Sequence, residues 1–300
     1  MFSRKHPYLF FILVFFSVIA VTLTGVTLLI LIGIKGFDFA RFDEIGGEKV
    51  GIVEVTGLIL DSKNVISSLK KFREDDSIKA IIVRIDSPGG AVGPSQEIFR
   101  EIKKTSSHKK IVASMGSIAA SGGYYIAAGA DGIIANPGTI TGSIGVIMEY
   151  TNFKDILDKI GLKPVVFKSG EYKDLGSPVR KITSAESQIL QGFVNKIHKQ
   201  FIRDVSKGRK MDLAKVEEIA DGRIYTGEEA KVLGLIDRLG NFEDSIEWAG
   251  RMGGIKGKIS TVYARQKRSS ILEYLLGSSF EEIANHFVTK NMKAGYIYRP

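Results

Sequence analysis

The stretch Lys79-Ala-Ile-Ile-Val-Arg-Ile-Asp-Ser-Pro-Gly-Gly90 decides the fold class, because it joins a short β-branched run to a tight turn. Val and Ile favour strands, while Pro88 and Gly89 suit the two central positions of a type II turn. Lys49–Thr56 and Lys110–Met115 have the same apolar, β-branched character. These stretches therefore predict buried strands at intervals along the chain.

Helical patterns lie between these strands. Ser62–Phe72 and Gln96–Lys104 predict helices, and Pro164–Lys168 predicts one more strand. Strands that alternate with helices form a mostly parallel sheet with both faces covered. We therefore expect an α/β fold.

The second half of the chain is more helical. Capping boxes begin at Thr183 and at Thr226, and the helix after Thr226 is expected to end at Gly234. After Thr183, apolar residues recur at helical spacing and share one face, namely Leu190, Val194, Ile197, Phe201 and Val205. That stripe is either core or a subunit interface.

The N-terminal part contains a long apolar run. From Pro7 to Ile34 no residue is charged, and the run is long enough to span a bilayer core of roughly 30 Å. The alternative is a cleaved signal peptide, but its apolar region is typically only about 7 to 15 residues long, and no Ala-x-Ala site follows here. We therefore expect an uncleaved transmembrane helix over 7–34 that contacts membrane lipid.

The charge balance gives little information about partners. The chain has 42 Lys and Arg against 33 Asp and Glu, and its net charge is +9. Basic and acidic residues are interspersed without long runs of one sign, so nucleic-acid binding is not expected. Basic residues flank the apolar run on both sides and barely discriminate its orientation. The absence of cysteine fits an oxidising or a reducing compartment.

Met115-Gly-Ser-Ile-Ala-Ala-Ser-Gly-Gly-Tyr-Tyr125 places a serine at the start of a predicted helix that runs through Ala128. A serine at this position typically caps the helix. The alternative is a nucleophile, because free N–H groups at the helix start, including that of Gly122, would stabilise negative charge beside the Ser121 hydroxyl.

A serine nucleophile needs a base that takes its proton. No histidine signature surrounds the four histidines, which are His6, His108, His198 and His286. The candidate base is Lys173 in Ser169-Gly-Glu-Tyr-Lys-Asp174, although most lysines are solvated surface charges. A lysine base must be neutral, which burial or a nearby positive charge favours. A hydroxyl of Ser143 or Thr141 would be suited to orient such an amine.

The segment Asp86-Ser-Pro-Gly-Gly90 has two interpretations. By itself it is typical of a tight turn. Its glycines also leave backbone N–H groups unobstructed, so the amide of Gly90 is a candidate donor to a developing oxyanion, a contribution of roughly 3 to 4 kcal/mol.

Four motifs occur together in a fixed order, Asp86-Ser-Pro-Gly-Gly90, Ala119-Ala-Ser-Gly-Gly-Tyr-Tyr125, Thr141-Gly-Ser-Ile-Gly145 and Tyr172-Lys-Asp174. In this combination the chain resembles the bacterial signal peptide peptidase A family of membrane-bound serine peptidases. The resemblance runs from about Val50 to Gly240 and includes Ala220-Asp-Gly-Arg-Ile-Tyr-Thr-Gly-Glu-Glu-Ala230. It implies a ClpP/crotonase-like fold with a Ser/Lys dyad.

The resemblance also implies roles for individual residues. The family's nucleophile falls on Ser121 and its general base on Lys173. Ser143 matches the hydroxyl that holds the lysine, and the amides of Gly90 and Gly122 match the oxyanion hole. No metal and no cofactor are expected.

The resemblance further implies a cellular setting. The chain is similar to the short, single-copy form of the family, whose members form homo-oligomeric rings in which neighbouring subunits contribute the Ser and the Lys. The expected location is the cell membrane, with the catalytic domain on the extracytoplasmic face. The expected substrates are cleaved signal peptides and other apolar peptides, with broader membrane-protein quality control as the alternative.

The expected organisation has five parts. These are a flank at 1–6, the anchor at 7–34, a linker at 35–48, the peptidase domain at 49–265 and a C-terminal helical segment and tail at 266–300. The tail ends in Tyr296-Ile-Tyr-Arg-Pro300, which is apolar and extended in character, and we expect it to occupy the peptide groove beside Gly90.

Two other classes of function are open at this point. One is an acyl-CoA enzyme on the same crotonase-like fold, in which the glycine amides would polarise a thioester and a carboxylate would act as base. The other is a catalytically silent membrane scaffold, in which Ser121 is only a helix cap.

Overall fold

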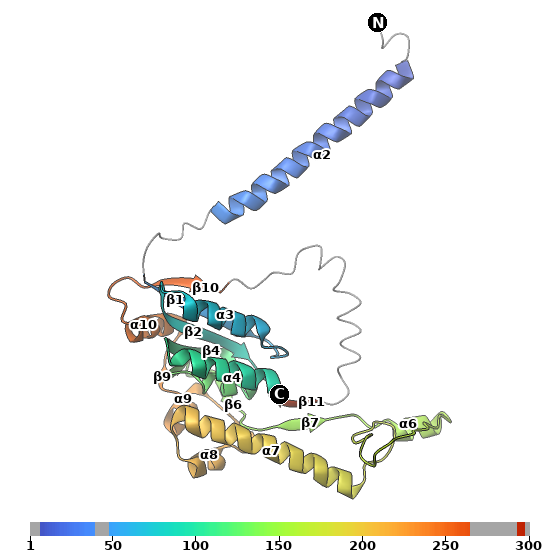
Figure 1. The fold of residues 1–300 in the computed structure, drawn as a ribbon, viewed down its shortest axis with the longest axis vertical. Helices are drawn as coiled ribbons and strands as arrows, with labels where there is room; N and C mark the ends of the chain where they lie inside the picture. Colours follow the sequence, from blue (N-terminus) through green and yellow to red (C-terminus); the bar gives the residue numbers. More distant parts are fainter. Residues whose placement is uncertain (1–6, 40–47, 265–292, 298–300) are drawn as a thin grey trace. The chain divides into compact units, whose positions relative to one another are not determined.

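The computed structural model describes residues 7–39, 48–264 and 293–297 (Figure 1). The chain forms two units, Met1–Gly47 and Glu48–Pro300. In the first unit, helix α2 covers Pro7–Phe39 and contains an apolar window, Phe10–Thr27, with a mean hydropathy of 2.4. The predicted apolar helix is therefore present, and its length and composition suffice to cross a membrane.

The threonine hydroxyls of α2 form hydrogen bonds within the helix itself. Thr22, Thr24 and Thr27 each donate to a backbone carbonyl one turn earlier, at 2.9, 2.7 and 2.7 Å. Such bonds allow a hydroxyl to lie in an apolar environment without water. The threonines are thus compatible with a membrane-spanning helix.

The second unit is built on a mostly parallel sheet (Figure 1). The strands along its main path are, in spatial order, β10 (Ser260–Tyr263), β1 (Lys49–Thr56), β2 (Ile78–Ser87), β4 (Lys110–Ala120), β5 (Gly132–Ala135) and β9 (Arg238–Leu239). All neighbours on this path are parallel. Strand β6 (Ile140–Gly142) continues parallel to the far end of β4, and β8 (Ile224–Tyr225) pairs antiparallel with β6.

Both faces of the sheet are covered, as predicted. The larger core includes side chains of helices α3 (Lys63–Glu74), α4 (Val92–Ser106), α5 (Gly122–Ala127), α7 (Ser184–Arg209), α8 (Leu213–Ile219) and α9 (Gly227–Leu233). The smaller core lies under α10 (Phe242–Met252). Side chains of β2 alternate between the two, because Ile81 and Val83 enter the larger core and Ala80 and Ile82 the smaller one.

A second, three-stranded sheet includes residues 293–297, near the C-terminus. Strand β11 (Lys293–Ile297) lies between β3 (Gly89–Ala91) and β7 (Ile147–Glu149) and is antiparallel to both. This sheet joins the turn after β2 to a segment near the middle of the chain and to the C-terminal tail. The remaining described helix, α6 (Lys154–Lys159), follows β7.

Most predicted elements are confirmed. The strands of Lys49–Thr56, Lys79–Asp86 and Lys110–Met115 are present as β1, β2 and β4, the last extended to Ala120. Both capping boxes form, and Gly234 ends α9 with a φ of 82°. In the stripe of α7, Ile197, Phe201 and Val205 are buried in the core, while Leu190 and Val194 are half-buried.

The predicted strand at Pro164–Lys168 is wrong. The segment is irregular, and Val165 and Phe167 are 76% and 96% exposed. A β-branched run becomes a strand only where a neighbouring strand pairs with it, and none of the described strands does so here. Of the C-terminal helical segment and tail expected at 266–300, residues 293–297 form a strand and the others lie outside the described residues.

Candidate active site

Ser121 lies between β4 and α5 with an unusual backbone conformation, a φ of 54° and a ψ of −115°. Outside glycine, such a conformation costs roughly 1 to 3 kcal/mol and persists only where the surroundings enforce it. The Ser121 N–H donates to the carbonyl oxygen of Gly142 at 2.8 Å, and the Ser121 carbonyl accepts from the N–H of Tyr125 at 2.8 Å. The serine is therefore held from both sides, and it is only 1% exposed.

The hydroxyl of Ser121 does not cap α5. It forms no other hydrogen bond within the described part of the chain, and the N–H of Gly122 also lacks an acceptor there. Free N–H groups are expected at a helix start. The helix-cap interpretation of Ser121 is therefore wrong, and its hydroxyl and the neighbouring amide are both without a partner among the described residues.

Ser143 is the neighbour of Ser121 on the adjacent strand end. Strand β6 runs parallel to β4 with Gly142 opposite Ala120, so the next residues of the two strands come together. Ser143 also has a positive φ, of 50°, and is 7% exposed. Two strained serines therefore lie side by side where these strands end.

The hydroxyl of Thr141 is already engaged in a structural hydrogen bond. Its hydroxyl donates to the carbonyl oxygen of Ala119 at 2.7 Å and so fastens β6 to β4. The hydroxyl of Ser143 forms no hydrogen bond with any described residue. Of the two hydroxyls considered for orienting an amine, only that of Ser143 has a proton not already donated to a described residue.

Two glycines allow close backbone approaches around the turn after β2. A Cβ on Gly123 would lie 2.8 Å from the carbonyl oxygen of Ser87, and one on Gly90 would lie 2.2 Å from the carbonyl oxygen of Ile59. Neither position accepts a side chain without a shift of backbone. Gly89 has the predicted positive φ, here 103°. The turn and the start of α5 are thus in direct contact.

The amide of Gly90 faces the tail strand. Ile59 pairs with the far side of β3 by donating to Gly89 at 3.0 Å and accepting from Ala91 at 2.8 Å. Successive peptide groups of a strand point to opposite sides, so the N–H of Gly90 points away from Ile59. On that side Tyr296 of β11 lies opposite Gly90.

Strand β11 pairs with β3 along one edge and with β7 along the other. Gly295 pairs with Ala91 on one side and with Ile147 on the other. An extended segment thus lies beside Gly90, as expected for the tail. Within the described residues, β7 pairs with β11 alone.

A pocket of about 470 Å³ opens beside Ser143. Val146, Ile147 and Val194 give it apolar walls, and His198 contributes a polar edge. Because Ile147 also pairs with β11, the pocket lies next to one strand of the three-stranded sheet. Its size and mixed lining suit a side chain of a bound peptide.

Lys173 lies in a turn of the segment between α6 and α7, and its side chain is exposed. The backbone N–H of Lys173 donates to Gly170 at 3.1 Å, while its ammonium forms no hydrogen bond or ion pair with a described residue. In particular, no hydrogen bond joins it to Ser121 or Ser143. In the described structure of one chain, the side chains of Ser121 and Lys173 are therefore not joined by a hydrogen bond.

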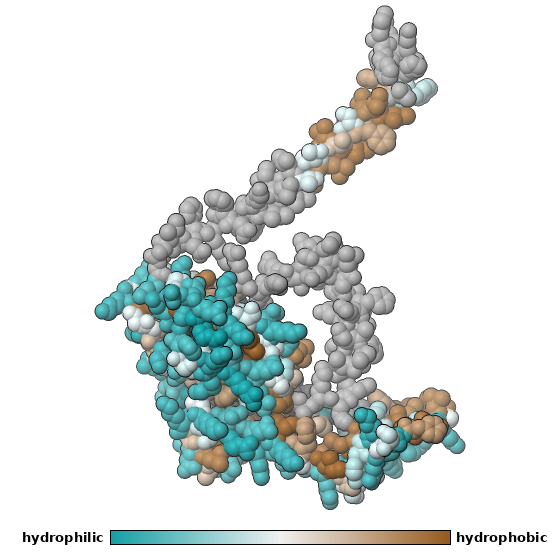
Figure 2. All heavy atoms as spheres, in the orientation of Figure 1, coloured by the Kyte–Doolittle hydropathy of each residue, from teal (hydrophilic) through white to brown (hydrophobic). Residues whose placement is uncertain are grey.

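The segment that carries Lys173 exposes a large apolar surface. We call residues 151–183 the arm; its helix α6 contains no buried residue and projects beyond the sheet (Figure 1). Figure 2 shows apolar side chains gathered over this region. The exposed apolar residues of the arm include Ile156, Ile160, Leu162, Val166 and Phe167. Contiguous exposed patches of this kind mark interaction surfaces.

A cluster of four charged residues lies next to Lys173 in the chain. Hydrogen bonds from Arg180 and Lys168 hold the pKa of Asp174 well below its usual range. Arg180 and the capping contacts of Thr183 lower the pKa of Glu186 to about 2, and the two carboxylates raise the pKa of Arg180. Asp174, Arg180 and Glu186 are therefore charged at neutral pH.

Among the described residues, no hydrogen bond joins a histidine to Ser121. The ring of His198 lies 3.1 Å from the carbonyl oxygen of Ile144, and that of His108 contacts Ser107. Within the described ranges, no cluster of three His, Cys, Asp or Glu residues is suited to hold a metal ion.

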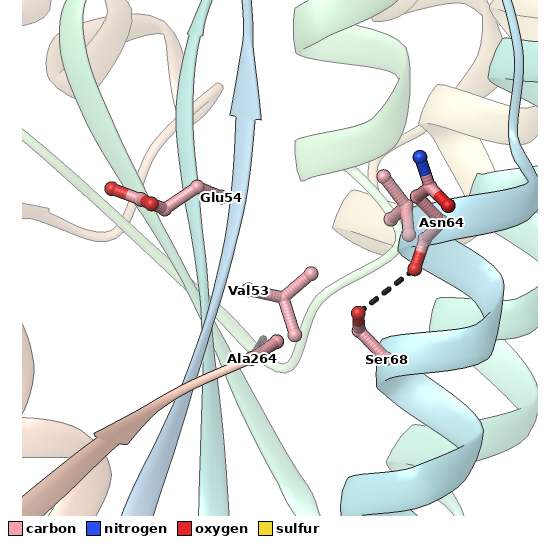
Figure 3. A pocket seen from close by; sticks show the side chains of 6 residues that line it. Val53, Glu54, Asn64, Ser68 and Ala264 are labelled. Atoms are coloured by element: carbon pink, nitrogen blue, oxygen red, sulfur yellow. Dashed lines mark hydrogen bonds between the residues drawn. The ribbon is translucent and has the colours of Figure 1, made fainter. Parts of the chain in front are cut away.

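A second hollow lies between β1 and α3 (Figure 3). Its volume of about 10 Å³ is at the lower limit for a single water molecule. The hydroxyl of Ser68 in its wall donates to the carbonyl oxygen of Asn64 at 2.8 Å, so this group is already satisfied by its own helix. We assign no ligand to this hollow.

Known families match the chain over most of its second unit. The profile of peptidase family S49 matches residues 103–256, and that of Clp protease matches residues 52–139. The chain belongs to peptidase family S49. This S49 peptidase is similar to a Synechocystis protein named "Putative protease", with 47% identity over 69% of the chain and 76% of the relative.

Two further relatives extend the comparison. A Methanocaldococcus jannaschii protein named "Putative protease" is 30% identical over 90% of the chain and 91% of the relative. An Enterococcus faecium protein named "Putative signal peptide peptidase SppA" is 39% identical over 67% of the chain and 62% of the relative. These matches confirm the resemblance inferred from the motifs, the ClpP-like fold and the class of serine peptidase.

Two features of the site in this S49 peptidase were not predicted from sequence. Gly123 was seen only as part of a small-residue run, and its contact with Ser87 depends on tertiary packing. Arg180 was not singled out at all, although it lies between Asp174 and the predicted capping box at Thr183. An arginine between two acidic residues on a turn is the signal that would have drawn notice to it.

Proposed function

We propose that this S49 peptidase is a membrane-anchored serine endopeptidase in which Ser121 is the nucleophile and Lys173 the general base. The observation that supports this most is the state of Ser121. Its backbone is strained, its hydroxyl is free of a cap bond, and it lies beside the free amide of Gly122. Strain of this kind is concentrated at functional sites, and a strand-to-helix turn is a recurring way to present a serine nucleophile.

The proposed reaction is acyl transfer. The Oγ of Ser121 bonds to the peptide carbonyl carbon while its proton passes to the Nζ of Lys173. The oxyanion then accepts hydrogen bonds from the amides of Gly90 and Gly122, and Ser143 orients the lysine. The C–N bond breaks as the lysine returns the proton to the leaving amine. A water that the lysine deprotonates hydrolyses the ester and restores Ser121.

The peptide is proposed to lie where β11 lies, between β3 and β7. Backbone hydrogen bonds to both strands would supply affinity, and the pocket beside Ser143 would take a side chain. Cleaved signal peptides and other apolar peptides are the substrates we propose. Strand pairing does not depend on side chains, and this favours broader membrane-protein quality control as the second candidate.

The dyad is proposed to form between neighbouring subunits of a homo-oligomeric ring. Lys173 is exposed in the single chain, whereas a lysine base must be neutral, which burial favours. The exposed apolar residues of the arm need a surface to pack against, and a second copy of the chain can supply it. The same copy would bring its own Ser121 to this Lys173. Contact between subunits would then cover the lysine and complete the site.

The location is proposed from the apolar helix. Helix α2 would anchor the enzyme in the cell membrane through residues 7–34, with the second unit on the extracytoplasmic face. An active site tethered at the membrane would meet apolar peptides at high local concentration.

The test uses two variants and two matched controls in the full-length protein. Ser121→Ala and Lys173→Ala are each expected to lower kcat by roughly 10⁴-fold or more while the protein stays folded. Ser117→Ala and Lys215→Ala, at exposed positions outside the arm, should leave kcat unchanged. A serine-reactive phosphonate should label Ser121 in the wild type and in both controls. It should not label Ser121→Ala, and it should label Lys173→Ala far more slowly because the base is missing. Turnover at the wild-type rate in Ser121→Ala or Lys173→Ala would overturn the assignment.

A further inference from the structure

The turn that carries Lys173 has few bonds of its own. Backbone hydrogen bonds within it join only near neighbours, with Leu175 donating to Tyr172 at 3.1 Å and Ser177 donating to Asp174 at 3.0 Å. Bonds of this range shape a turn but do not fix its position relative to the rest of the protein. The position of the turn must therefore be fixed by a contact with a residue outside it.

Arg180 supplies such a connection. Its Nε donates to Asp174 at 2.7 Å, and its Nη2 donates to the backbone carbonyl of the same residue at 3.2 Å. The other side of the guanidinium contacts both carboxylate oxygens of Glu186, one of them at 2.8 Å from Nη1. One planar group therefore joins the residue after Lys173 to the first turn of α7.

The far end of this connection is firmly placed. Glu186 is 3% exposed, and its carboxylate also accepts from the N–H of Thr183 at 2.9 Å in the capping box. Helix α7 in turn packs through Phe201 and Val205 into the main core. The path from the core through Glu186 and Arg180 thus ends one residue from Lys173.

We infer that Arg180 is a positioning residue. By linking Asp174 to Glu186 it fixes the turn of Lys173 relative to the first turn of α7, so that the Lys173 amine can reach the Ser121 hydroxyl that it deprotonates. The inference rests on the proposed role of Lys173 as base. The planar fork of arginine matches a carboxylate on each side, whereas a lysine offers a single point charge. Lys168 also binds Asp174, at 2.6 Å, but lies on the same stretch of the arm and gives no link to α7.

The experiment compares Arg180→Gln, Arg180→Lys and Lys173→Ala in the full-length enzyme, with Arg251→Gln as the control. Arg251 pairs with Glu247 at 3.4 Å on the exposed face of α10. Turnover of an apolar peptide gives kcat and KM, and hydrogen exchange reports on the turn at 170–177. We expect Arg180→Gln to lower kcat by about 100-fold with KM within about twofold, because misplacing a reacting group by about 1 Å has this effect.

Exchange at 170–177 should become faster in Arg180→Gln while exchange in β4 and α5 stays unchanged. Arg180→Lys should recover only a small part of kcat, and Arg251→Gln should match the wild type. If Arg180→Gln does not fold, Asp174→Asn removes the other end of the same contact and is tested in its place.

The outcomes separate the two proposals. Full turnover by Lys173→Ala would overturn the proposed function. An inactive Lys173→Ala beside an Arg180→Gln enzyme with wild-type kcat would overturn the positioning role alone. A rise in KM with unchanged kcat would also contradict it, because it would place Arg180 in peptide binding.

Discussion

The N–H of Ser121 donates a 2.8 Å hydrogen bond to the carbonyl oxygen of Gly142, and this bond joins the ends of β4 and β6. It places Ser121 beside Ser143, both with a positive φ. The two hydroxyls are therefore presented by the sheet itself, without any contribution from the arm. The proposed base is not placed by the sheet, because Lys173 lies on the exposed arm.

The contact between Gly123 and Ser87 should be needed for activity. A Cβ at Gly123 would approach the Ser87 carbonyl oxygen to 2.8 Å and push α5 away from the turn of Gly90. We expect Gly123→Ala to lower kcat by about 100-fold and to destabilise the fold by about 1 to 3 kcal/mol. Kinetics and thermal unfolding measure the two effects.

Gly93 provides the matched control for this substitution. It lies in the first turn of α4, and a Cβ there would meet nothing within 4 Å. Gly93→Ala should therefore leave kcat unchanged and alter stability by less than about 1 kcal/mol. Equal losses in both variants would show that the close approach at Gly123 is not what matters.

The tail should compete with peptide substrates. Strand β11 pairs with β3 and β7, so deletion of residues 293–300 should lower KM and strengthen peptide-aldehyde inhibition severalfold, because a tethered segment acts at a high effective concentration. Tyr296→Pro should act in the same direction by removing an N–H from the strand, whereas Tyr296→Phe should not. Unchanged KM and inhibition after the deletion would contradict competition by the tail.

Mixed oligomers should reveal whether the dyad is shared between chains. Ser121→Ala and Lys173→Ala are each expected to be inactive, but in co-assembled rings some sites would combine an intact serine with an intact lysine from the neighbour. Random mixing in equal amounts should restore about a quarter of the wild-type activity. A mixture as inactive as its components, with mixed rings demonstrated by two affinity tags, would place both residues in one chain.

The ion pair of Arg180 and Glu186 should make stability depend on pH in the acid range. The pKa of Glu186 is lowered from 4.5 to about 2 in the folded protein, chiefly by the hydrogen bonds from Arg180. Because the folded-state pKa is depressed, the stabilisation is present above about pH 4.5 and is lost as the pH falls towards 2.

Glu186→Gln tests this, because glutamine still completes a capping box while removing the charge. The Tm difference between the wild type and this variant should be constant from about pH 7 to pH 5 and should shrink below about pH 4.5. Glu247→Gln, in an exposed pair, should show a difference near zero throughout. A wild-type minus Glu186→Gln difference that does not change with pH would contradict the linkage.

Local sequence patterns predicted the three longest strands of the main sheet. The runs that became β1, β2 and β4 are β-branched and bounded by turn residues, and the capping boxes at Thr183 and Thr226 act within one helical turn. Such signals depend on neighbours in the chain. Pro164–Lys168 carries the same β-branched signal but has no partner strand among the described residues, and so the prediction failed there.

For the site, the sequence by itself determined which residues are available: a serine among small residues, a lysine without a histidine competitor, and glycines able to leave amides free. The tertiary structure alone decided that the backbone of Ser121 is strained and that its hydroxyl does not cap α5. It also decided that Gly123 contacts Ser87 and that Lys173 is exposed on an apolar arm. The physical reason is that strain, close backbone approach and burial depend on contacts between segments far apart in the chain.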